Sequence, residues 1–457
     1  MIRAIVAILA LAAAPLAAEP QVPRTQAEID LSFAPVVRAA APAVVNIYAR
    51  RVVRERRSLF DDPVFEEFFR EFAPERPRVQ NSLGSGVILS PDGFVVSNYH
   101  VVGRATDIRV VLNDRREFSA EVVLADAAAD LAILRLEGAA DLPHLALRDS
   151  DTLEVGELVL AIGNPFGVGQ TVSSGIVSAV ARSGPATGDR RGYFVQTDAP
   201  INPGNSGGAL VDTAGRLVGV NTSILSRSGG SIGIGFAIPA DLVARFVAEA
   251  RAGAETFRRP WAGMRGQPVD ADMAGALGLD RPRGMVVAEL HPASPFAAEG
   301  LRRGDVILAL DGAAVNGPAG LAYRLAVAGP GAEVAAELWR EGRARAVTVR
   351  LAPPPEAPPR AALTLGRDTA LPGLALARVN PAVIAEMGLP LGARGVVVTD
   401  PGRYGTRAGL EAGDVIRAVS GREVTTPREV RRALAPGGWH EIVVERGARR
   451  VAIRFRA

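Results

Sequence analysis

The sequence predicts a mainly β fold followed by a repeated α+β module, and three observations support that prediction. The chain has 457 residues, enough for about three domains. It contains 49 glycines and 33 prolines, which favours many turns and therefore short strands. Short apolar runs separated by turn residues fill residues 30 to about 250, and the last third of the chain repeats itself.

The amino terminus, "MIRAIVAILALAAAPLAAEP", has one positive charge followed by an apolar run to about Ala18. The uncharged run is shorter than the roughly 20 residues that a membrane-spanning helix needs. We therefore expect a signal peptide over residues 1–18, with an uncleaved anchor as the alternative. Because the end of the run is not a clean Ala-x-Ala, the cleavage position stays open. A leader of this kind predicts export to a bacterial periplasm without stable membrane insertion.

Composition excludes several kinds of chemistry. The chain lacks cysteine, which excludes disulfides and cysteine catalysis. Its four histidines are widely spaced, so we expect no metal site, and nothing indicates an organic cofactor. The net charge is +3, and the densest basic run, residues 50–57, reads as a solvated loop. No nucleic-acid partner is therefore expected.

A β-hairpin is predicted over residues 84–102, because "PDG" supplies a turn between "GSGVILS" and "FVVSNYHVV". Short strands at such turn-punctuated intervals suggest antiparallel barrels or sandwiches. The segment 240–253 predicts one closing helix with a glycine stop. We therefore place one domain over residues 30–253. The other predicted strand segments are 131–136, 157–163, 171–181, 208–222 and 233–239.

Two copies of one module follow this domain. The segment "EGLRRGDVILALDG" (299–312) realigns with "AGLEAGDVIRAVSG" (408–421) at an offset of 109 residues. We assign the copies to residues 258–352 and 362–457. Between them, residues 353–361 are proline-rich, which favours an extended, semi-rigid linker.

A phenylalanine-rich segment, residues 59–72, has four phenylalanines spaced as on one face of a helix. Two interpretations stay open. The segment is either a hydrophobic flap for a partner subunit or substrate, or a helix packed on its own domain.

The stretch "DAPINPGNSGGALVD" surrounds one serine, Ser206, with glycines, as expected for a nucleophile that a peptide carbonyl must approach closely. Acyl transfer by serine needs a base, a carboxylate that orients the base, and donors for the oxyanion. His100 and Asp130 both precede Ser206 in the chain. The resulting order, His, Asp, Ser, is the order in chymotrypsin-type double barrels. Asp126 is a nearby alternative to Asp130.

The pattern "GNSGG" also fits the nucleophile elbow of α/β-hydrolases. That elbow requires a helix after the serine, and an acid and a histidine further along the chain. The residues after Ser206 instead predict strand, turn and strand, which disfavours this alternative.

The motifs "SGVILSPDGFVVSNYHVV", "AIGNPFGVGQTVSSGIVSAVARSG" and "FVQTDAPINPGNSGGALV" resemble the HtrA family of serine proteases, in its DegP/DegQ/MucD-like branch. The resemblance extends over nearly the whole chain. It implies a chymotrypsin-like double β-barrel followed by two PDZ domains. Tyr99, where the family often has Asn or Ala, is a mild departure.

By this resemblance, His100 is the general base, Asp130 orients it and Ser206 is the nucleophile. The backbone N–H groups of Gly204 and Ser206, with Asn205, are expected to form the oxyanion hole.

The resemblance also implies two substrate-binding segments. Ile232, Gly233 and Ile234 are expected to form the wall of an apolar pocket that selects small or medium aliphatic residues. In the first PDZ-like module, Ala262, Gly263 and Met264 resemble a carboxylate-binding loop. The corresponding segment of the second module, 372–376, is a poorer match, and its role stays open.

Taken as a member of this family, the chain is expected to be a periplasmic, ATP-independent serine endopeptidase that degrades misfolded or unfolded proteins. It is expected to form homo-oligomers built from trimers and to capture carboxyl-terminal peptides, with possible chaperone activity. Four segments resemble the activation loops of the family: 164–174, 183–192, 198–205 and 225–233. The alternative function is a holdase chaperone or peptide-binding scaffold with minor proteolysis.

Overall fold

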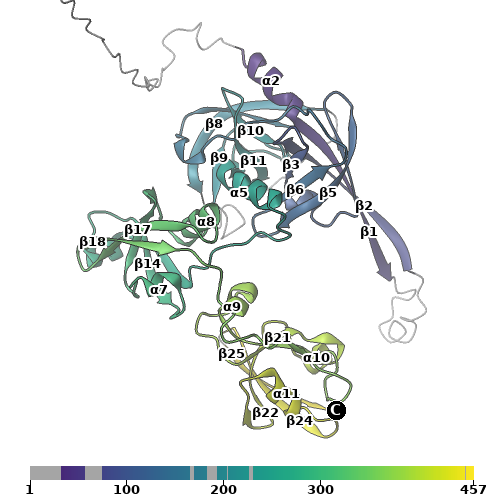
Figure 1. Cartoon of the computed structure of the whole chain (residues 1–457), viewed down its shortest axis with the longest axis vertical. Helices are drawn as coiled ribbons and strands as arrows, with labels where there is room; N and C mark the ends of the chain where they lie inside the picture. Colours follow the sequence, from purple (N-terminus) through teal and green to yellow (C-terminus); the bar gives the residue numbers. More distant parts are fainter. Residues whose placement is uncertain are drawn as a thin grey trace, which may run out of the picture.

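The computed structural model describes residues 32–56, 75–164, 169–182, 193–202, 204–225, 230–447 and 449–457 (Figure 1). The predicted signal peptide and the phenylalanine-rich segment 59–72 lie outside the described residues, as do loop 183–192 and parts of the other three predicted activation loops. Across the ranges that are described, no helix combines the length and the apolar character needed to cross a bilayer.

The first barrel is closed by six strands in the order β1-β2-β3-β6-β5-β4. The closure comes from β1, which pairs antiparallel with both β2 and β4. The hairpin predicted over 84–102 is confirmed, since Val87 of β2 pairs with Val96 of β3. The strands are β1 (Val44–Arg56), β2 (Glu75–Ile88), β3 (Phe94–Ser97), β4 (Asp107–Val111), β5 (Glu117–Asp126) and β6 (Leu131–Leu136).

The second barrel has the strand order β10-β11-β12-β9-β8-β7 and is closed by pairing of β10 with β7. The predicted double β-barrel is therefore confirmed. The strands are β7 (Leu158–Gly163), β8 (Thr171–Arg182), β9 (Phe194–Thr197), β10 (Ala209–Asp212), β11 (Leu217–Ile224) and β12 (Gly235–Pro239).

The helix predicted to close this domain is α5 (Ala240–Arg251), and the chain turns at Gly253 with a φ of 76°. Its apolar face carries Val243 and Phe246, both fully buried, and it packs against strands of both barrels. Helix α5 therefore covers the seam between the barrels (Figure 1). The remaining helical turns of this domain are α2 (Ala34–Ala40), η1 (Ala41–Ala43), α4 (Tyr99–Val102) and η2 (Ser150–Thr152).

The two repeated modules each form one antiparallel sheet flanked by helices. The first contains β13 (Met264–Pro268), α6 (Ala271–Leu277), β14 (Met285–Leu290), α7 (Pro295–Ala298), β15 (Val306–Leu310), β16 (Ala313–Ala314), α8 (Pro318–Ala328), β17 (Glu333–Arg340) and β18 (Arg343–Arg350). The second contains β19 (Leu363–Thr364), β20 (Ala375–Arg378), α9 (Pro381–Met387), β21 (Val396–Asp400), α10 (Gly402–Ala408), β22 (Val415–Val419), β23 (Arg422–Glu423), α11 (Pro427–Ala433), β24 (Trp439–Arg446) and β25 (Arg449–Arg456).

The repeated "GD" dipeptide explains why both modules fold alike. Asp305, 2% exposed, receives two hydrogen bonds from the guanidinium of Arg340 at 2.5 and 2.6 Å. Asp414, 1% exposed, receives the equivalent pair from Arg446 at 2.7 and 2.8 Å. A bidentate guanidinium is what makes it possible to bury a carboxylate at this position. Both copies therefore tie the start of a central strand to the same later strand.

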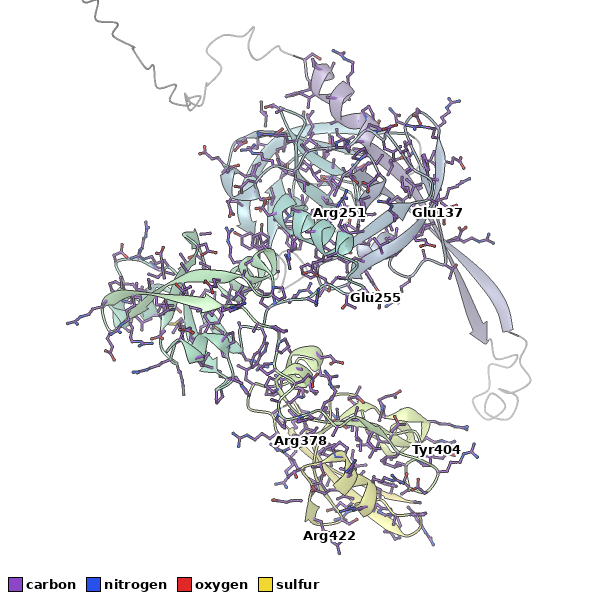
Figure 2. The ribbon with its side chains drawn as sticks, viewed as in Figure 1. Glu137, Arg251, Glu255, Arg378, Tyr404 and Arg422 are labelled. Atoms are coloured by element: carbon purple, nitrogen blue, oxygen red, sulfur yellow. The ribbon has the colours of Figure 1, made fainter. Side chains whose placement is uncertain are left out.

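The first module packs on the barrels through α8, which lies beside α5 (Figure 1). Tyr323 of α8 stacks on Tyr193 of the barrel domain with ring centroids 4.1 Å apart. The adjacent Arg324 pairs with Asp151 at 2.5 Å. The second module is reached through the linker and does not share this contact. Figure 2 shows Arg378 at the end of the second module nearer the first, and Arg422 at its far end.

Candidate active site

The first barrel positions a histidine and a carboxylate against each other. After β3 ends at Ser97, the short helix α4 carries His100 out of the strand. The ring Nδ1 of His100 lies 2.9 and 2.8 Å from the two carboxylate oxygens of Asp130. The backbone N–H of His100 also donates to Asp130 Oδ1 at 3.0 Å. The carboxylate therefore fixes both the ring and the backbone of the histidine.

Asp130 is held in an unusual backbone conformation immediately before β6. Its φ is 51°, in the left-handed region that non-glycine residues seldom adopt. Two donors secure its carbonyl: Asn98 Nδ2 at 2.9 Å and the Tyr99 N–H at 3.2 Å. The strained conformation is thus stabilised by the chain that leads into α4, and it turns the carboxylate toward His100.

Asp126, the alternative carboxylate, is engaged elsewhere. Its oxygens accept hydrogen bonds from Arg259 at 2.6 and 2.8 Å and from the Ala129 N–H at 2.7 Å. Burial raises the pKa of Asp126, but the guanidinium of Arg259 outweighs it and leaves the pKa below its usual value. Asp126 is therefore a structural ion-pair partner.

The second barrel contributes Ser206, which lies on the loop before β10. Its carbonyl accepts a hydrogen bond from the backbone N–H of Ser85 in the first barrel at 2.9 Å. The Ser85 hydroxyl, fully buried, donates to the Gly204 carbonyl at 2.8 Å. The serine-bearing loop is thus clamped at two points by β2 of the first barrel.

The Ser206 hydroxyl donates to the carbonyl of Thr222 at 3.0 Å. Within the described part of the chain, no hydrogen bond joins Ser206 Oγ to the ring of His100. The structure nevertheless links the three predicted residues, because the Thr222 hydroxyl donates to Asp130 Oδ2 at 2.6 Å. Ser206, Thr222, Asp130 and His100 thus form one connected line across the seam between the barrels.

Sequence reasoning missed Thr222. This residue is 7% exposed and lies within β11, where its side chain crosses to the other barrel. Nothing in the local sequence "VNTSI" marks it, because its contact depends on how the two barrels pack.

The glycines after Ser206 are also required by the packing of the fold. A Cβ on Gly207 would lie 2.1 Å from the Ser85 carbonyl oxygen, and its φ is 83°. A Cβ on Gly208 would lie 2.3 Å from the Ile162 carbonyl oxygen. These two glycines allow the serine loop to pack against the protein's own backbone, which is a steric requirement beyond the one predicted from the sequence.

Gly204 has a φ of 101°, which turns the backbone just before the serine. Among the described residues, the N–H groups of Gly204 and Ser206 have no acceptor, whereas the Asn205 N–H donates to the Asn202 carbonyl at 2.9 Å. The arrangement thus leaves two backbone donors for an oxyanion, and the N–H of Asn205 is already used.

The predicted wall of the substrate pocket lies next to the loop that carries Ser206, and it consists of Ile232, Gly233 and Ile234. Ile232 is 60% exposed, whereas Ile234 packs against the barrel core. Gly233 has a φ of 81°. The N–H of Ser231 donates to Asn202 Oδ1 at 3.1 Å, so this segment is tied to the loop that carries Ser206.

The first repeated module carries a loop and a groove at its first strand. The carbonyls of Ala262 and Gly263 accept hydrogen bonds from Ser294 Oγ and from the His291 N–H at 2.5 and 2.8 Å. Their own N–H groups have no acceptor in the part of the chain that is described. Beside them lies a groove of about 360 Å³ between β13 and α8, lined by Met264, Met285, Leu321, Leu325 and their neighbours. Trp261, which precedes this loop, is buried at 8% exposure and does not line the groove.

The chain is similar to known proteins over most of its length. Residues 84–220 match the trypsin-like peptidase domain, and residues 245–351 and 395–446 each match the PDZ domain. A Halomonas elongata protein named "Probable periplasmic serine endoprotease DegP-like" is 40% identical over 417 residues, which cover 87% of this chain and 86% of the relative. The chain belongs to the HtrA family of serine proteases.

Two further proteins show the same similarity to this chain. The Escherichia coli (strain K12) protein named "Periplasmic pH-dependent serine endoprotease DegQ" is 37% identical over 408 residues, covering 88% of this chain and 86% of the relative. The solved structure "HtrA-type protease AlgW with decapeptide" is 39% identical, with a TM-score of 0.53, and covers 71% of this chain and 99% of that one. The chain is therefore a serine endopeptidase with a trypsin-like domain and two PDZ domains.

Membership of the HtrA family also excludes the α/β-hydrolase alternative. Ser206 is followed by β10, a turn at Gly215 and β11, with no helix after the serine. The nucleophile elbow needs a helix there.

Proposed function

We propose that this HtrA-family enzyme is a periplasmic, ATP-independent endopeptidase that degrades unfolded or misfolded proteins, with His100, Asp130 and Ser206 as its catalytic residues. The observation that carries the proposal is the line of hydrogen bonds from His100 through Asp130 and Thr222 to Ser206. The periplasmic location is supported by the names of the two relatives and by the predicted signal peptide.

The chemistry begins with a rotation of one side chain. The Ser206 hydroxyl leaves the Thr222 carbonyl and donates to His100 Nε2. As Ser206 Oγ attacks the peptide carbonyl carbon, the imidazole takes its proton and the carbonyl π electrons move to the oxygen. The N–H groups of Gly204 and Ser206 then stabilise this oxyanion.

Collapse of the tetrahedral intermediate breaks the C–N bond, and His100 gives its proton to the leaving amine. Water then hydrolyses the acyl-enzyme through the same base. Asp130 keeps Nδ1 of the ring protonated throughout and stabilises the imidazolium. Thr222 Oγ1 donates a hydrogen bond to the Asp130 carboxylate.

The substrate wall formed by Ile232, Gly233 and Ile234 favours small or medium aliphatic residues, since it presents no carboxylate of its own. Such residues are buried in folded proteins, so their exposure identifies an unfolded chain. The preference for unfolded substrates follows from this without a separate recognition element.

We assign capture of a carboxyl-terminal peptide to the first PDZ domain. The unused N–H groups of Ala262 and Gly263, beside the apolar groove next to Met264, suit a terminal carboxylate and the side chain before it. In the second PDZ domain the equivalent donors are used, because Gly373 N–H binds the Leu365 carbonyl and Leu374 N–H binds the Leu371 carbonyl. The second domain therefore serves another purpose, which we take to be assembly.

From the resemblance to the HtrA family we also propose that the protein assembles into trimers and larger homo-oligomers. On the same basis we propose a chaperone activity beside proteolysis. The four loop segments expected to switch between inactive and active geometries are part of the same resemblance.

The test is digestion of unfolded casein by the wild-type protein and by Ser206→Ala. The wild type is expected to cut casein without ATP, and the variant to leave it intact. Ser119→Ala, a serine in β5 away from the site, is the matched control and should keep full activity. If neither the wild type nor the control cuts casein while all three suppress its aggregation, the holdase alternative is correct.

A further inference from the structure

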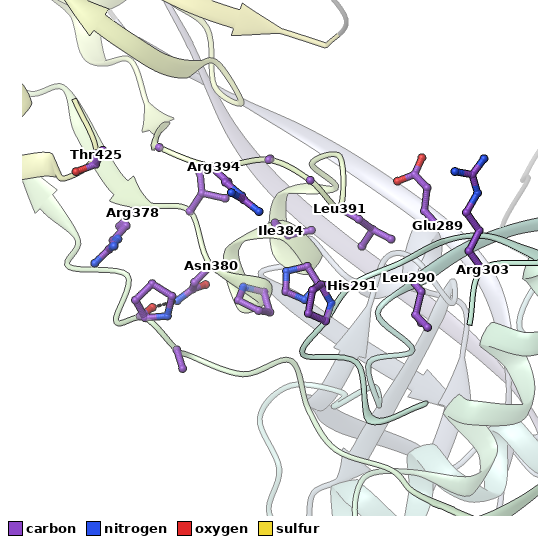
Figure 3. Close-up of a pocket in the computed structure, with 18 of the residues that line it drawn as sticks. Glu289, Leu290, His291, Arg303, Arg378, Asn380, Ile384, Leu391, Arg394 and Thr425 are labelled. Atoms are coloured by element: carbon purple, nitrogen blue, oxygen red, sulfur yellow. Dashed lines mark hydrogen bonds between the residues drawn. The ribbon is translucent and has the colours of Figure 1, made fainter. Parts of the chain in front are cut away.

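A cavity lies between the two PDZ domains and is not used by the proposed function. Its volume is about 910 Å³, which is within the range of ligand sites. The first domain contributes the end of β14 and the turn that holds Arg302 and Arg303. The second contributes the segments around Arg378 and Arg394 (Figure 3).

The charge of this cavity is one-sided. Its walls carry four arginines, at positions 302, 303, 378 and 394, and one acidic residue, Glu289. None of these four guanidiniums has a carboxylate partner among the described residues. By contrast, Arg340 of the first domain is paired with Asp305, and Arg446 of the second with Asp414. The cavity therefore concentrates positive charge that the protein itself does not neutralise.

His291 adds a hydrogen-bond donor in the middle of the cavity. Its Nδ1 accepts from the Ala293 N–H at 3.0 Å, so the neutral ring carries its proton on Nε2. Burial and the charge of Arg394 from the other domain both lower the pKa of His291. The ring is therefore a neutral donor beside the guanidinium, an arrangement suited to a carboxylate oxygen.

Apolar side chains separate the charges. Leu290 of the first domain and Ile384 and Leu391 of the second line the same cavity (Figure 3). A small inorganic anion would neutralise one or two guanidiniums and leave these side chains in contact with water. An occupant that satisfies the whole surface has several carboxylates with apolar groups between them.

We propose that this interdomain cavity binds an acidic segment of a polypeptide substrate, with glutamate or aspartate side chains alternating with apolar ones. The peptide places carboxylates against the arginines from both domains and so holds the two PDZ domains in one orientation. The cavity adjoins the Ala262–Gly263 loop, since the His291 N–H binds the Gly263 carbonyl, but none of Ala262, Gly263 and Ser206 lines it. The proposal therefore goes beyond the proposed function.

The experiment measures binding of a fluorescent peptide of alternating glutamate and leucine to the full chain. The peptide has an amidated carboxyl terminus, which keeps it out of the carboxylate loop, and the protein carries Ser206→Ala so that nothing is cleaved. We expect the parent protein to bind and the double variant Arg378→Ala, Arg394→Ala to bind about tenfold more weakly. Hydrogen exchange should show protection of residues 378–395 on binding.

The matched control is Arg403→Ala, Arg422→Ala, which removes the same charge from exposed positions of the same domain and should change the affinity less than about twofold. Glu289→Arg, which removes the single acid, should tighten binding. The proposal is overturned if the parent does not bind, if both double variants lose affinity equally, or if a lysine–leucine peptide binds as well. It is also overturned if inorganic phosphate competes as effectively as the peptide, since the site would then hold any anion.

Discussion

The two barrels contribute unequally to the proposed catalytic site. The first presents His100 and Asp130 already joined by hydrogen bonds of 2.8 and 2.9 Å. The second presents Ser206 with its hydroxyl bound to its own barrel, at the Thr222 carbonyl. The comparison teaches that the proposed base and its carboxylate are preorganised, whereas the proposed nucleophile must leave the Thr222 carbonyl before it can donate to His100.

The barrels also interlock in both directions. Ser85 of the first barrel holds the loop around Gly204 and Ser206, and Thr222 of the second barrel reaches Asp130 of the first. The first barrel therefore positions Ser206 of the second, and the second barrel positions Asp130 of the first. The proposed site forms only where the two barrels pack together.

The largest loss of activity should come from disrupting the preorganised pair of His100 and Asp130. Asp130→Asn keeps the shape of the side chain and tolerates the left-handed backbone, but it no longer stabilises the imidazolium or the required tautomer. We expect kcat on a peptide substrate to fall by about 10⁴-fold with little change in stability. Asp126→Asn is the control and should keep nearly full kcat, since its partner is Arg259. Equal losses in the two variants would contradict the assignment of Asp130.

A smaller effect should come from the residue that joins the barrels. Thr222→Val removes the hydroxyl that donates to Asp130 but keeps the backbone carbonyl that accepts from Ser206. One charge-assisted hydrogen bond contributes about 1.5–3 kcal/mol, so kcat should fall roughly 10- to 100-fold while KM stays nearly constant. Thr222→Ser should restore most of the rate. A rise in KM alone, or no rescue by serine, would show that Thr222 has only a packing role.

The smallest effect on catalysis is expected for a substitution that lowers the stability of the second barrel without touching the proposed site. Arg148, 13% exposed at its side chain, pairs with Glu157 at 2.5 Å and with the buried Asp212 at 3.5 Å. Arg148→Met leaves Glu157, 29% exposed at its side chain, without its ion-pair partner, whereas the buried Asp212 keeps Arg216 at 2.8 Å. We therefore expect a loss of about 1–2 kcal/mol in unfolding free energy with kcat unchanged at low temperature. Arg259→Met, beside the first barrel, leaves Asp126, 16% exposed at its side chain, with a backbone donor from Ala129 and should cost a similar amount.

The pH dependence of that loss has a definite sign. Burial raises the pKa of Glu157, but its hydrogen bonds from Arg148 and the Glu154 N–H outweigh burial and hold the pKa below 4.5. The stabilisation is therefore present above pH 4.5 and is lost as the pH falls through the folded-state pKa. Urea unfolding should show the gap between wild type and Arg148→Met narrowing in acid. A gap that widens there would contradict the ion-pair account.

Sequence patterns were sufficient for the elements whose periodicity and turns are local. The Pro-Asp-Gly hairpin, the strand at residues 131–136 and the helix that ends before Gly253 all follow from neighbouring residues. Thr222 could not be predicted in this way, because it meets Asp130 only when two barrels pack together. For the same reason the steric need for glycine at 207 could not be predicted, since the carbonyl that excludes a Cβ belongs to Ser85 of the other barrel.

The central claim is that a base held by the first barrel activates an alcohol held by the second. The most direct measurement is the rate and position of labelling by a fluorophosphonate, which reacts with an activated serine. We predict a single labelled residue, Ser206, with the rate reduced by about 10³-fold in His100→Ala. Labelling at another serine, or an unchanged rate in His100→Ala, would contradict the account.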